Sequence, residues 1–366
     1  MIKQNNININ LNRKNFVSSI VLIKKIREII SYFKKNNLSE KVFIVTDSNV
    51  ANIYLSDTVK LFKNSGFVVF SYVFKAGEEQ KSFKTLIDIY EHALKCGVDR
   101  QYNVIALGGG VVGDISGLFA STYMRGINLI QVPTTLLAMV DSSIGGKTAV
   151  NTKNGKNIVG TFYQPQFIFI NPEFLKTLDM KQLKNGMAEV IKYSVSFDEK
   201  FFNQLSYKVN NSVLTNNDFN QIIYKCCKFK ANIVQEDELE KKGIRQFLNF
   251  GHTFAHALET ITKYKKFLHG EAVAVGMLFA VKLATKINMC NKEVEFKVKD
   301  LLESFCFDLK PKISCDKDNL LNLMKKDKKS VSNKIKFVLP TKIGNVISNV
   351  EVPDKLVLQT IEEILK

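Results

Sequence analysis

The chain has 366 residues, of which 45% are hydrophobic and 24% are charged, the composition of a soluble globular protein. This length predicts two domains or one large one, with enough chain to bury a core. No apolar signal core follows Met1, and no run approaches the ~18 apolar residues of a membrane span, so we predict a cytoplasmic protein without a membrane partner. The six cysteines lack the spacing of a disulfide framework or a metal site, which favours buried, reduced thiols.

The net charge of +17 admits more than one interpretation. A basic protein binds nucleic acid or membranes, or it attracts small anionic substrates. The lysines are spread along the chain in short clusters such as residues 325–329, and no helix-turn-helix, RNP-like or zinc-finger pattern accompanies them. We therefore favour a lysine-rich solvated surface over a nucleic-acid interface, and we expect no nucleic-acid partner.

The first half of the chain alternates strand-like and helix-like segments. Compact apolar runs predict strands at residues 7–11, 41–46, 66–74, 103–107 and 129–132. Apolar residues at helical spacing predict helices at residues 20–33, 50–64 and 83–95, and a further helix that follows the glycine-rich segment 108–114 and runs through residue 121. Such alternation predicts a mainly parallel sheet covered by helices on both faces.

From about residue 182 the pattern changes to long helical segments. Apolar residues recur every three or four positions in residues 182–194, 200–207, 219–235, 245–260 and 270–287, and one late strand-like piece spans residues 335–339. The predicted architecture is an α/β nucleotide-binding domain at residues 1–178, followed by an α-helical domain that binds metal and substrate at residues 179–366.

Residues 108–113 read G-x-G-x-x-G, which satisfies the dinucleotide-binding fingerprint after a predicted strand and before a predicted helix. Glycines let the backbone approach a pyrophosphate, whose charge is met by the helix N-terminus. The acidic residue expected about 20 positions later to hold a ribose is absent, because residues 131–135 read Gln-Val-Pro-Thr-Thr. Asp47, Glu78 and Lys81 are other candidates for the ribose, although acids at strand ends and helix starts are often caps.

A second glycine-rich stretch follows. Residues 145–148 read Gly-Gly-Lys-Thr, like the end of a phosphate-binding P-loop, but the first glycine of that motif is absent, because residue 140 is Val and residue 141 is Asp. We reject an ATPase on that ground. What remains is a glycine-rich backbone in which Lys147, Lys156 and Asn157 are available to bind an anion and Asp141 is available as a hydrogen-bond acceptor.

Three of the four histidines, His252, His256 and His269, lie close together in the sequence. If their segment is helical, the four-residue spacing sets the first two imidazoles on one face, and the third can return to them from a loop. Imidazole is a zinc ligand, and a catalytic zinc usually takes three protein ligands. A metal site is one interpretation, and satisfied structural histidines are the other.

Glu189 and Lys192 lie three residues apart in a predicted helix and so share a face. An exposed Glu–Lys pair is commonplace and is worth only a few tenths of a kcal/mol. The functional alternative is a carboxylate ligand to the metal with a lysine placed for the substrate.

Taken together and in this order, the motifs resemble the 3-dehydroquinate synthase family of the shikimate pathway. The resemblance covers about residues 40–345 and is carried by residues 108–114, 133–147, 186–192, 248–259 and 269–271. It implies conversion of 3-deoxy-D-arabino-heptulosonate 7-phosphate to 3-dehydroquinate and phosphate by transient oxidation with NAD, phosphate elimination, reduction, ring opening and an intramolecular aldol reaction. It also implies NAD, one divalent metal (zinc, or alternatively cobalt) and a homodimer.

The resemblance further assigns roles to individual positions. The implied metal ligands are Glu189, His252 and His269. The implied phosphate-binding residues are Lys147, Asn157, Arg245 and, from the neighbouring subunit, Arg125. The residues implied around the rest of the substrate are Lys192, Lys230, Asn249, His256 and Lys328, with Lys329 as an alternative to the last. Asp141 is expected between nicotinamide and substrate. Lys156 is expected to contact both NAD and substrate. The other implied NAD contacts are Asp47, Glu78, Lys81, Gly109, Gly110, Asp114, Thr134, Thr135 and Lys147.

Three alternatives to this function are open. Related sugar-phosphate cyclases act on sedoheptulose 7-phosphate or glucose 6-phosphate, which lack the carboxylate that Lys230, Arg245 and Lys328 are expected to bind. A metal-dependent polyol dehydrogenase would accumulate NADH and would need no phosphate-binding lysines. A nucleic-acid-binding protein would bind DNA with a steep dependence on salt.

Overall fold

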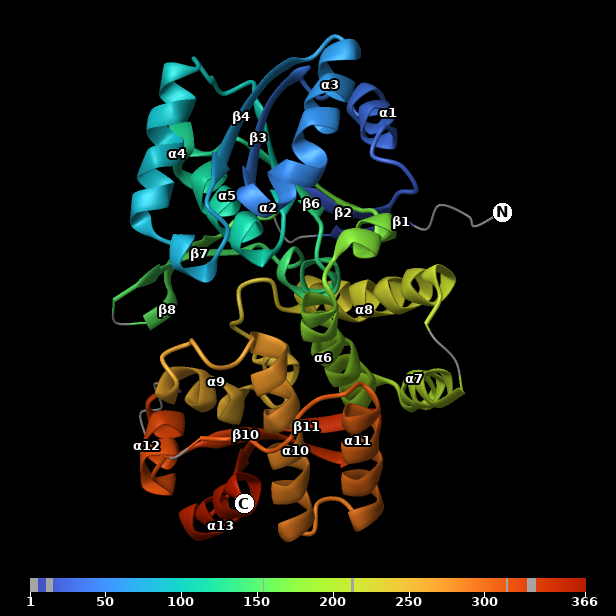
Figure 1. The fold of residues 1–366 in the computed structure, drawn as a ribbon, viewed down its shortest axis with the longest axis vertical. Helices are drawn as coiled ribbons and strands as arrows, with labels where there is room; N and C mark the ends of the chain where they lie inside the picture. Colours follow the sequence, from blue (N-terminus) through green and yellow to red (C-terminus); the bar gives the residue numbers. More distant parts are fainter. Residues whose placement is uncertain (1–5, 11–15, 154, 212–213, 314, 328–333) are drawn as a thin grey trace. The chain divides into compact units, whose positions relative to one another are not determined.

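The computed structural model describes residues 6–10, 16–153, 155–211, 214–313, 315–327 and 334–366. The chain divides into two compact units, shown in Figure 1. Unit 1 comprises residues 1–182 and 219–239, and unit 2 comprises residues 183–218 and 240–366. The domain boundary at residue 178 stays a prediction.

Unit 1 is built on a seven-stranded sheet in the order β1-β2-β9-β6-β5-β3-β4. Strand β1 pairs antiparallel with β2, and all the other neighbouring pairs are parallel. The predicted α/β class with a mainly parallel sheet is therefore confirmed. The strands are β1 (Asn6–Asn10), β2 (Val17–Leu22), β3 (Lys41–Asp47), β4 (Val68–Phe74), β5 (Asn103–Gly108), β6 (Asn128–Pro133) and β9 (Phe167–Ile170).

Helices flank this sheet. Figure 1 shows α1 and α3 on one side of β3 and β4, with α4 and α5 on the other. Buried residues of β3, β5, α4 and α5 form one apolar core, in which Val45, Val104 and Phe119 are fully enclosed. The helical segments of unit 1 are α1 (Glu28–Lys35), the run α2 (Ser48–Val50), η1 (Ala51–Leu55) and α3 (Ser56–Asn64), η2 (Glu78–Gln80), α4 (Phe83–Lys95), α5 (Gly110–Thr122), η3 (Tyr123–Arg125), η4 (Ala138–Ser142), η5 (Pro172–Thr177) and most of α8 (Asn216–Glu236).

Two features of unit 1 differ from the predictions. The helix predicted at residues 20–33 is wrong in its first part, because β2 occupies residues 17–22 and pairs with β9, which lies far along the chain. The hairpin of β7 (Lys147–Thr152) and β8 (Gly155–Phe162) was not predicted. Its first strand packs against α5.

Unit 2 is mainly helical, as predicted, and contains one antiparallel hairpin, β10 (Lys336–Lys342) and β11 (Asn345–Glu351). Helix α10 is buried on most of its surface because it packs against α9, α11, α13 and β10. No helix in the described part of the chain is long and apolar enough to cross a membrane. The helical segments are α6 (Met180–Phe197), α7 (Glu199–Asn211), η6 (Ile244–Asn249), α9 (His252–Ile261), α10 (His269–Lys286), α11 (Lys292–Ser304), α12 (Lys317–Asp327) and α13 (Asp354–Leu365).

The helix predicted at residues 245–260 is interrupted, and the interruption positions a histidine. Segment η6 ends at Asn249, Gly251 takes a left-handed backbone with φ 80°, and α9 begins at His252. A Cβ on Gly251 would lie 2.8 Å from the backbone nitrogen of Met277, and a Cβ on Gly276 would lie 2.0 Å from the Gly251 carbonyl oxygen. The close approach of α9 to α10 therefore requires glycine at both positions.

Candidate metal centre and nucleotide loop

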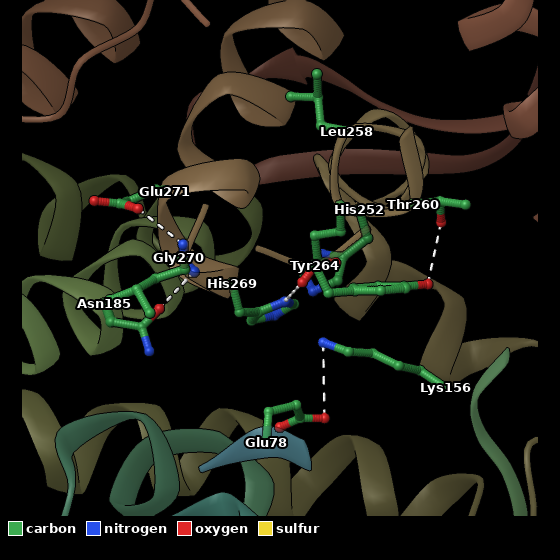
Figure 2. A network of polar contacts seen from close by, with 12 residues as sticks. Glu78, Lys156, Asn185, His252, Leu258, Thr260, Tyr264, His269, Gly270 and Glu271 are labelled. Atoms are coloured by element: carbon green, nitrogen blue, oxygen red, sulfur yellow. Dashed lines mark hydrogen bonds and ion pairs between the residues drawn. The ribbon is translucent and has the colours of Figure 1, made fainter. Parts of the chain in front are cut away.

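Three side chains of unit 2 converge on one point. Glu189 from α6, His252 from the start of α9 and His269 from the start of α10 each offer a ligand atom, and these atoms all lie within 4.8 Å of one another. The Nε2 atoms of His252 and His269 lie 3.4 and 3.5 Å from Glu189 Oε1. Figure 2 shows the two imidazole rings close together.

The other nitrogen of each imidazole is held by a neighbour. His252 Nδ1 lies 3.1 Å from the carbonyl oxygen of Phe250, and His269 Nδ1 lies 3.5 Å from Glu259 Oε1. A hydrogen acceptor at Nδ1 directs the Nε2 lone pair towards a bound cation, as is usual for metal-binding histidines. Both rings therefore present Nε2 to the same space as Glu189.

The first residues of α10 are fixed from α6. The Oδ1 atom of Asn185 accepts a hydrogen bond of 2.6 Å from the backbone N–H of Gly270, and a Cβ on Gly270 would lie 2.1 Å from the Asn185 carbonyl oxygen. Figure 2 shows this contact beside the histidines. Helix α6, which carries Glu189, is thus locked to the end of α10 that carries His269.

The charges at this centre are buried and mutually compensating. Glu189 is fully buried and forms an ion pair with Lys192, which is 2% exposed. Burial alone would raise the pKa of Glu189, but Lys192 and His252 outweigh it and hold that pKa well below its usual range. Burial, followed by the charge of Lys192, lowers the pKa of His252, which favours the neutral imidazole that binds metals.

His269 differs from His252 because two carboxylates face it. Burial acts to lower its pKa, but hydrogen bonding to Glu189 and Glu259 and the negative charge of both raise it to about 10. The proton on this imidazole would have to leave before a cation bound Nε2.

The residues fit a divalent metal. Both carboxylate oxygens of Glu189 are buried; Lys192 contacts Oε2, and the Nε2 atoms of the two histidines lie 3.4 and 3.5 Å from Oε1. A cation between this carboxylate and the two Nε2 atoms would satisfy them. Two imidazoles and one carboxylate form a donor set typical of a catalytic zinc, which keeps a further position open.

His256 takes no part in this cluster of ligand atoms. Its ring centroid lies 5.5 Å from that of His252, one turn earlier on α9, and the two rings are nearly perpendicular. The three grouped donors come from three different helices, so the i, i+4 histidine pair is not the pair that converges with the carboxylate.

In unit 1 the glycine-rich segment lies where a nucleotide loop is expected. Gly108 ends β5, Gly109 caps α5 and Gly110 begins the helix. A Cβ on Gly109 would meet the Thr135 methyl at 3.1 Å, and one on Gly110 would meet Ser142 Oγ at 3.1 Å. Glycine is therefore needed for this close packing, and the backbone N–H groups at the N-terminus of α5 favour an anionic ligand.

A buried lysine joins this loop to the β7–β8 hairpin. The Nζ atom of Lys81 donates hydrogen bonds to Asp114 Oδ2 and to Asn157 Oδ1. Burial raises the pKa of Asp114, and the charge of Lys81 opposes that shift. Close by, Lys156 Nζ lies 3.7 Å from Glu78 Oε1, a contact marked in Figure 2. Five of the predicted NAD or phosphate residues thus form two contact groups, Lys81 with Asp114 and Asn157, and Lys156 with Glu78.

A second pair in unit 1 involves α8. Lys230 is buried, with 6% of its surface exposed. Its Nζ donates hydrogen bonds to the carbonyl oxygen of Asp141 at 2.5 Å and to the Asp141 carboxylate at 2.6 Å. Asp141 lies in the π-helical turn η4, three residues before Ile144, which is followed by the left-handed Gly145 and Gly146. The buried ammonium therefore fixes the turn that leads into Lys147.

The remaining predicted residues are placed as follows. Asp47 caps α2 by accepting from the backbone N–H groups of Asn49 and Val50, the capping role considered above. Arg125 is exposed in a turn in which Met124, Arg125 and Gly126 all have positive φ. Arg245 is buried, with Nε 3.4 Å from Glu240 Oε1. Thr134 and Thr135 follow β6, Asn249 ends η6, and Lys328 and Lys329 lie outside the described residues.

Three residues at these sites were not predicted: Glu259, Asn185 and Asn151. Glu259 had a signal, because it lies seven residues after His252 and so on the same face of α9. Asn185 had none, because its partner is 85 positions away. Asn151 binds both the turn at residues 78–81 and strand β8, contacts that depend on tertiary structure alone.

Known proteins resemble the chain over nearly all of its length. Residues 71–185 match the family described as 3-dehydroquinate synthase N-terminal, and residues 186–330 match the one described as 3-dehydroquinate synthase C-terminal. The 3-dehydroquinate synthase of Endomicrobium trichonymphae is 50% identical over 97% of both chains. That of Crocosphaera subtropica is 41% identical over 90% of both chains.

Solved structures agree in fold. A 2-deoxy-scyllo-inosose synthase in complex with carbaglucose-6-phosphate, NAD+ and Co2+ superposes with a TM-score of 0.86, at 26% identity over 98% of this chain and 99% of that one. The 2-epi-5-epi-valiolone synthase of Streptomyces hygroscopicus subsp. jinggangensis, with NAD+ and Zn2+ bound, gives 0.88 at 25% identity over 97% and 98%. An iron-containing alcohol dehydrogenase from Thermococcus thioreducens, 16% identical with a TM-score of 0.66, shares the fold alone. With two family matches that together span residues 71–330 and a relative that is 50% identical over 97% of both chains, the chain belongs to the 3-dehydroquinate synthase family.

Proposed function

We propose that the protein is a carbon–oxygen lyase that converts 3-deoxy-D-arabino-heptulosonate 7-phosphate to 3-dehydroquinate and inorganic phosphate. The observation that carries this proposal is the Glu189–His252–His269 cluster, whose first two residues are buried, in a chain that belongs to the family. The reaction would proceed by transient oxidation, phosphate elimination, reduction, ring opening and an intramolecular aldol step. It belongs to the shikimate pathway, and its proposed location is the cytoplasm.

The proposed cofactors are NAD and one zinc or cobalt ion, as in the two structural relatives that contain NAD+ with Co2+ or Zn2+. Glu189, His252 and His269 would hold the metal, and the loop at Gly109 and Gly110 would hold the NAD pyrophosphate. When bound, NAD supplies the acceptor and then the donor of a hydride, and the metal supplies a Lewis acid for a substrate hydroxyl.

The chain itself would supply positioning and charge. Lys147, Asn157 and Arg245 would bind the substrate phosphate, and Lys192 and Lys230 would face its carboxylate and hydroxyl groups. Buried ammonium and guanidinium groups orient such anions because they are themselves held by neighbouring side chains. The contacts of Lys192 with Glu189 and of Lys230 with Asp141 support this assignment.

We also propose a homodimer in which Arg125 enters the active site of the neighbouring subunit. Helix α5 separates Arg125 from the nucleotide loop of its own chain, and at 1.5 Å per residue its 13 residues span roughly 20 Å. Arg125 is exposed and held in a left-handed turn, so it presents its charge outward. An assignment to the phosphate of a second copy is consistent with that position.

Phosphate release from the heptulosonate phosphate tests the proposal. We expect release that stops when a chelator removes the metal or when bound NAD is stripped, with no net accumulation of NADH. Alanine at Glu189, His252 or His269 should abolish metal binding and turnover while the circular dichroism spectrum is unchanged. Full activity of a metal-free preparation would refute the proposal.

The same assay separates the alternatives. A related sugar-phosphate cyclase would release phosphate from sedoheptulose 7-phosphate or glucose 6-phosphate and not from the carboxylated substrate. A polyol dehydrogenase would accumulate NADH and release no phosphate.

A further inference from the structure

Asn151, in the middle of the β7–β8 hairpin, bonds to three residues that the proposed function uses. Its backbone N–H donates to the carbonyl oxygen of Lys81 at 2.7 Å, and its side-chain Nδ2 donates to Glu78 Oε1 at 2.8 Å. Its Oδ1 accepts from the backbone N–H of Asn157 at 3.0 Å. One half-buried side chain thus joins the turn at residues 78–81 to strand β8.

The strand register explains why a side chain is needed here. Val150 pairs with Val159, but Thr152 pairs with Gly155, so Asn151 alone stands opposite residues 156–158. Such a bulge leaves backbone groups without a partner strand and re-aims the side chains around it. Asn157, inside the bulge, has a left-handed backbone with φ 56°, and Asn151 accepts the N–H group that the ladder does not pair.

The bulge also orients the polar network of the nucleotide site. Lys81 binds the side chain of Asn157, while Asn151 binds its main chain, so that Asn157 is held from both directions. Asn151 likewise fixes Glu78, whose carboxylate also lies 3.7 Å from Lys156. Without Asn151, the side chain of Glu78 would keep its contact with Lys156, and the side chain of Asn157 would keep its bond from Lys81.

We propose that Asn151 is a positioning residue, which holds Glu78, Lys81 and Asn157 in the arrangement that binds NAD. This inference rests on the proposed function. The position needs an amide, because it must donate to a carboxylate through Nδ2 and accept an N–H group through Oδ1 at the same time. In Asn151→Asp, the aspartate can still accept the N–H group of Asn157, but its carboxylate faces the carboxylate of Glu78. A second substitution, Glu78→Gln, would supply an amide N–H group that donates to this aspartate.

The test is a double-mutant cycle read by NAD binding to the metal-loaded protein, measured by titration calorimetry with NAD alone. We expect Asn151→Asp to raise the Kd for NAD about tenfold when position 78 is Glu, because two carboxylates then face each other. In the Glu78→Gln background the same substitution should change the Kd less than about twofold. Any direct contribution of Glu78 to NAD binding cancels in this comparison.

Ser121→Ala is the matched control. It removes a hydrogen bond of 2.9 Å from Thr161 Oγ1, which holds the same hairpin to α5 four residues after Asn157 in β8 and involves neither Glu78 nor Asn151. NAD affinity should stay within about twofold of that of the unmodified protein. Melting temperatures of the metal-loaded variants show whether each one is folded, and if Asn151→Asp does not fold, Asn151→Ala and Glu78→Ala form the same cycle without added charge.

An equal change in Kd in both backgrounds would overturn the inference, because Asn151 would then act independently of Glu78. A loss of NAD affinity in Ser121→Ala as large as that in Asn151→Asp would overturn it too, since general loosening of the hairpin would be the cause. If the unmodified protein neither binds NAD nor releases phosphate, the proposed function itself fails, a result distinct from failure of the cycle.

Discussion

Replacement of Lys192 by methionine tests whether the metal and this lysine balance the same buried charge. Glu189 is fully buried, and Lys192 is its ion-pair partner. Removing one partner of a buried pair costs about 3–5 kcal/mol, because the other charge is left uncompensated. We expect about 3 kcal/mol in the metal-free protein, since the imidazoles of His252 and His269 still lie 3.4 and 3.5 Å from the carboxylate.

That cost corresponds to a fall in melting temperature of about 10 °C for a unit of this size. A divalent cation bound to Glu189 would replace the missing positive charge, so the fall should be less than half as large in the zinc-loaded protein. Differential scanning calorimetry of the unmodified protein and of Lys192→Met, each with chelator and with zinc, measures both values. Turnover should be lost in either state if Lys192 also binds substrate.

Lys282→Met is the control for this experiment. Lys282 Nζ lies 3.1 Å from Glu295 Oε1, in a partly buried ion pair of unit 2 that involves none of the three proposed metal ligands. Its loss should lower the melting temperature equally with and without zinc. A fall for Lys192→Met that is the same in both states, or that is smaller than about 3 °C without metal, would refute the reasoning.

Three further changes have expected outcomes. Hydrogen bonds, chiefly one from Lys208, lower the pKa of Asp218 to about 2. The ionised carboxylate therefore stabilises the fold above pH ~4, and this stabilisation is lost as the pH falls towards 2. Asp218→Asn should lower the free energy of unfolding, measured in urea, by about 1 kcal/mol at pH 6 and by progressively less down to pH 3. Gly276→Ala should lower stability by more than about 3 kcal/mol and weaken zinc binding, because its Cβ would lie 2.0 Å from the Gly251 carbonyl oxygen; unchanged urea unfolding and zinc titration would contradict this. Burial raises the pKa of Cys227 to about 12, so mass spectrometry after iodoacetamide treatment of the native protein at pH 8 should find this thiol unmodified, in contrast to the denatured protein.

The sheet of unit 1 was predictable wherever its strands are buried on both faces. Strands β3 and β5 are unbroken apolar runs because helices cover them from both sides, and the helix at residues 83–95 was predicted with its observed bounds. Strand β2 was mistaken for the start of a helix because its partner β9 lies almost 150 residues later. Local periodicity carries no information about such a partner.

The metal ligands of the candidate site could be predicted from the sequence, but the residues that support them could not. Glu189, His252 and His269 are identified by residue type and by order along the chain, and the structure brings their ligand atoms together. Their supporting residues were not identified, because Asn185 binds a backbone N–H group 85 residues away and Asn151 binds a carboxylate 73 residues away. A common polar residue reveals such a role only once the fold places its partner beside it.

The interruption before His252 shows why helical spacing alone misjudged the histidines. A continuous helix through residues 245–260 would make His252 and His256 an equivalent pair on one face. Instead the left-handed Gly251 ends the preceding turn, and His252 becomes the first residue of α9, with Nδ1 facing the Phe250 carbonyl oxygen. His269 likewise opens α10, so both ligands occupy helix starts, where the chain direction is set by glycines in close contact and not by the helical repeat. Because the start of α10 is fixed to α6 at Gly270 and the start of α9 is fixed to α10 at Gly276, the loss of either contact should disorder the metal ligands before it unfolds unit 2.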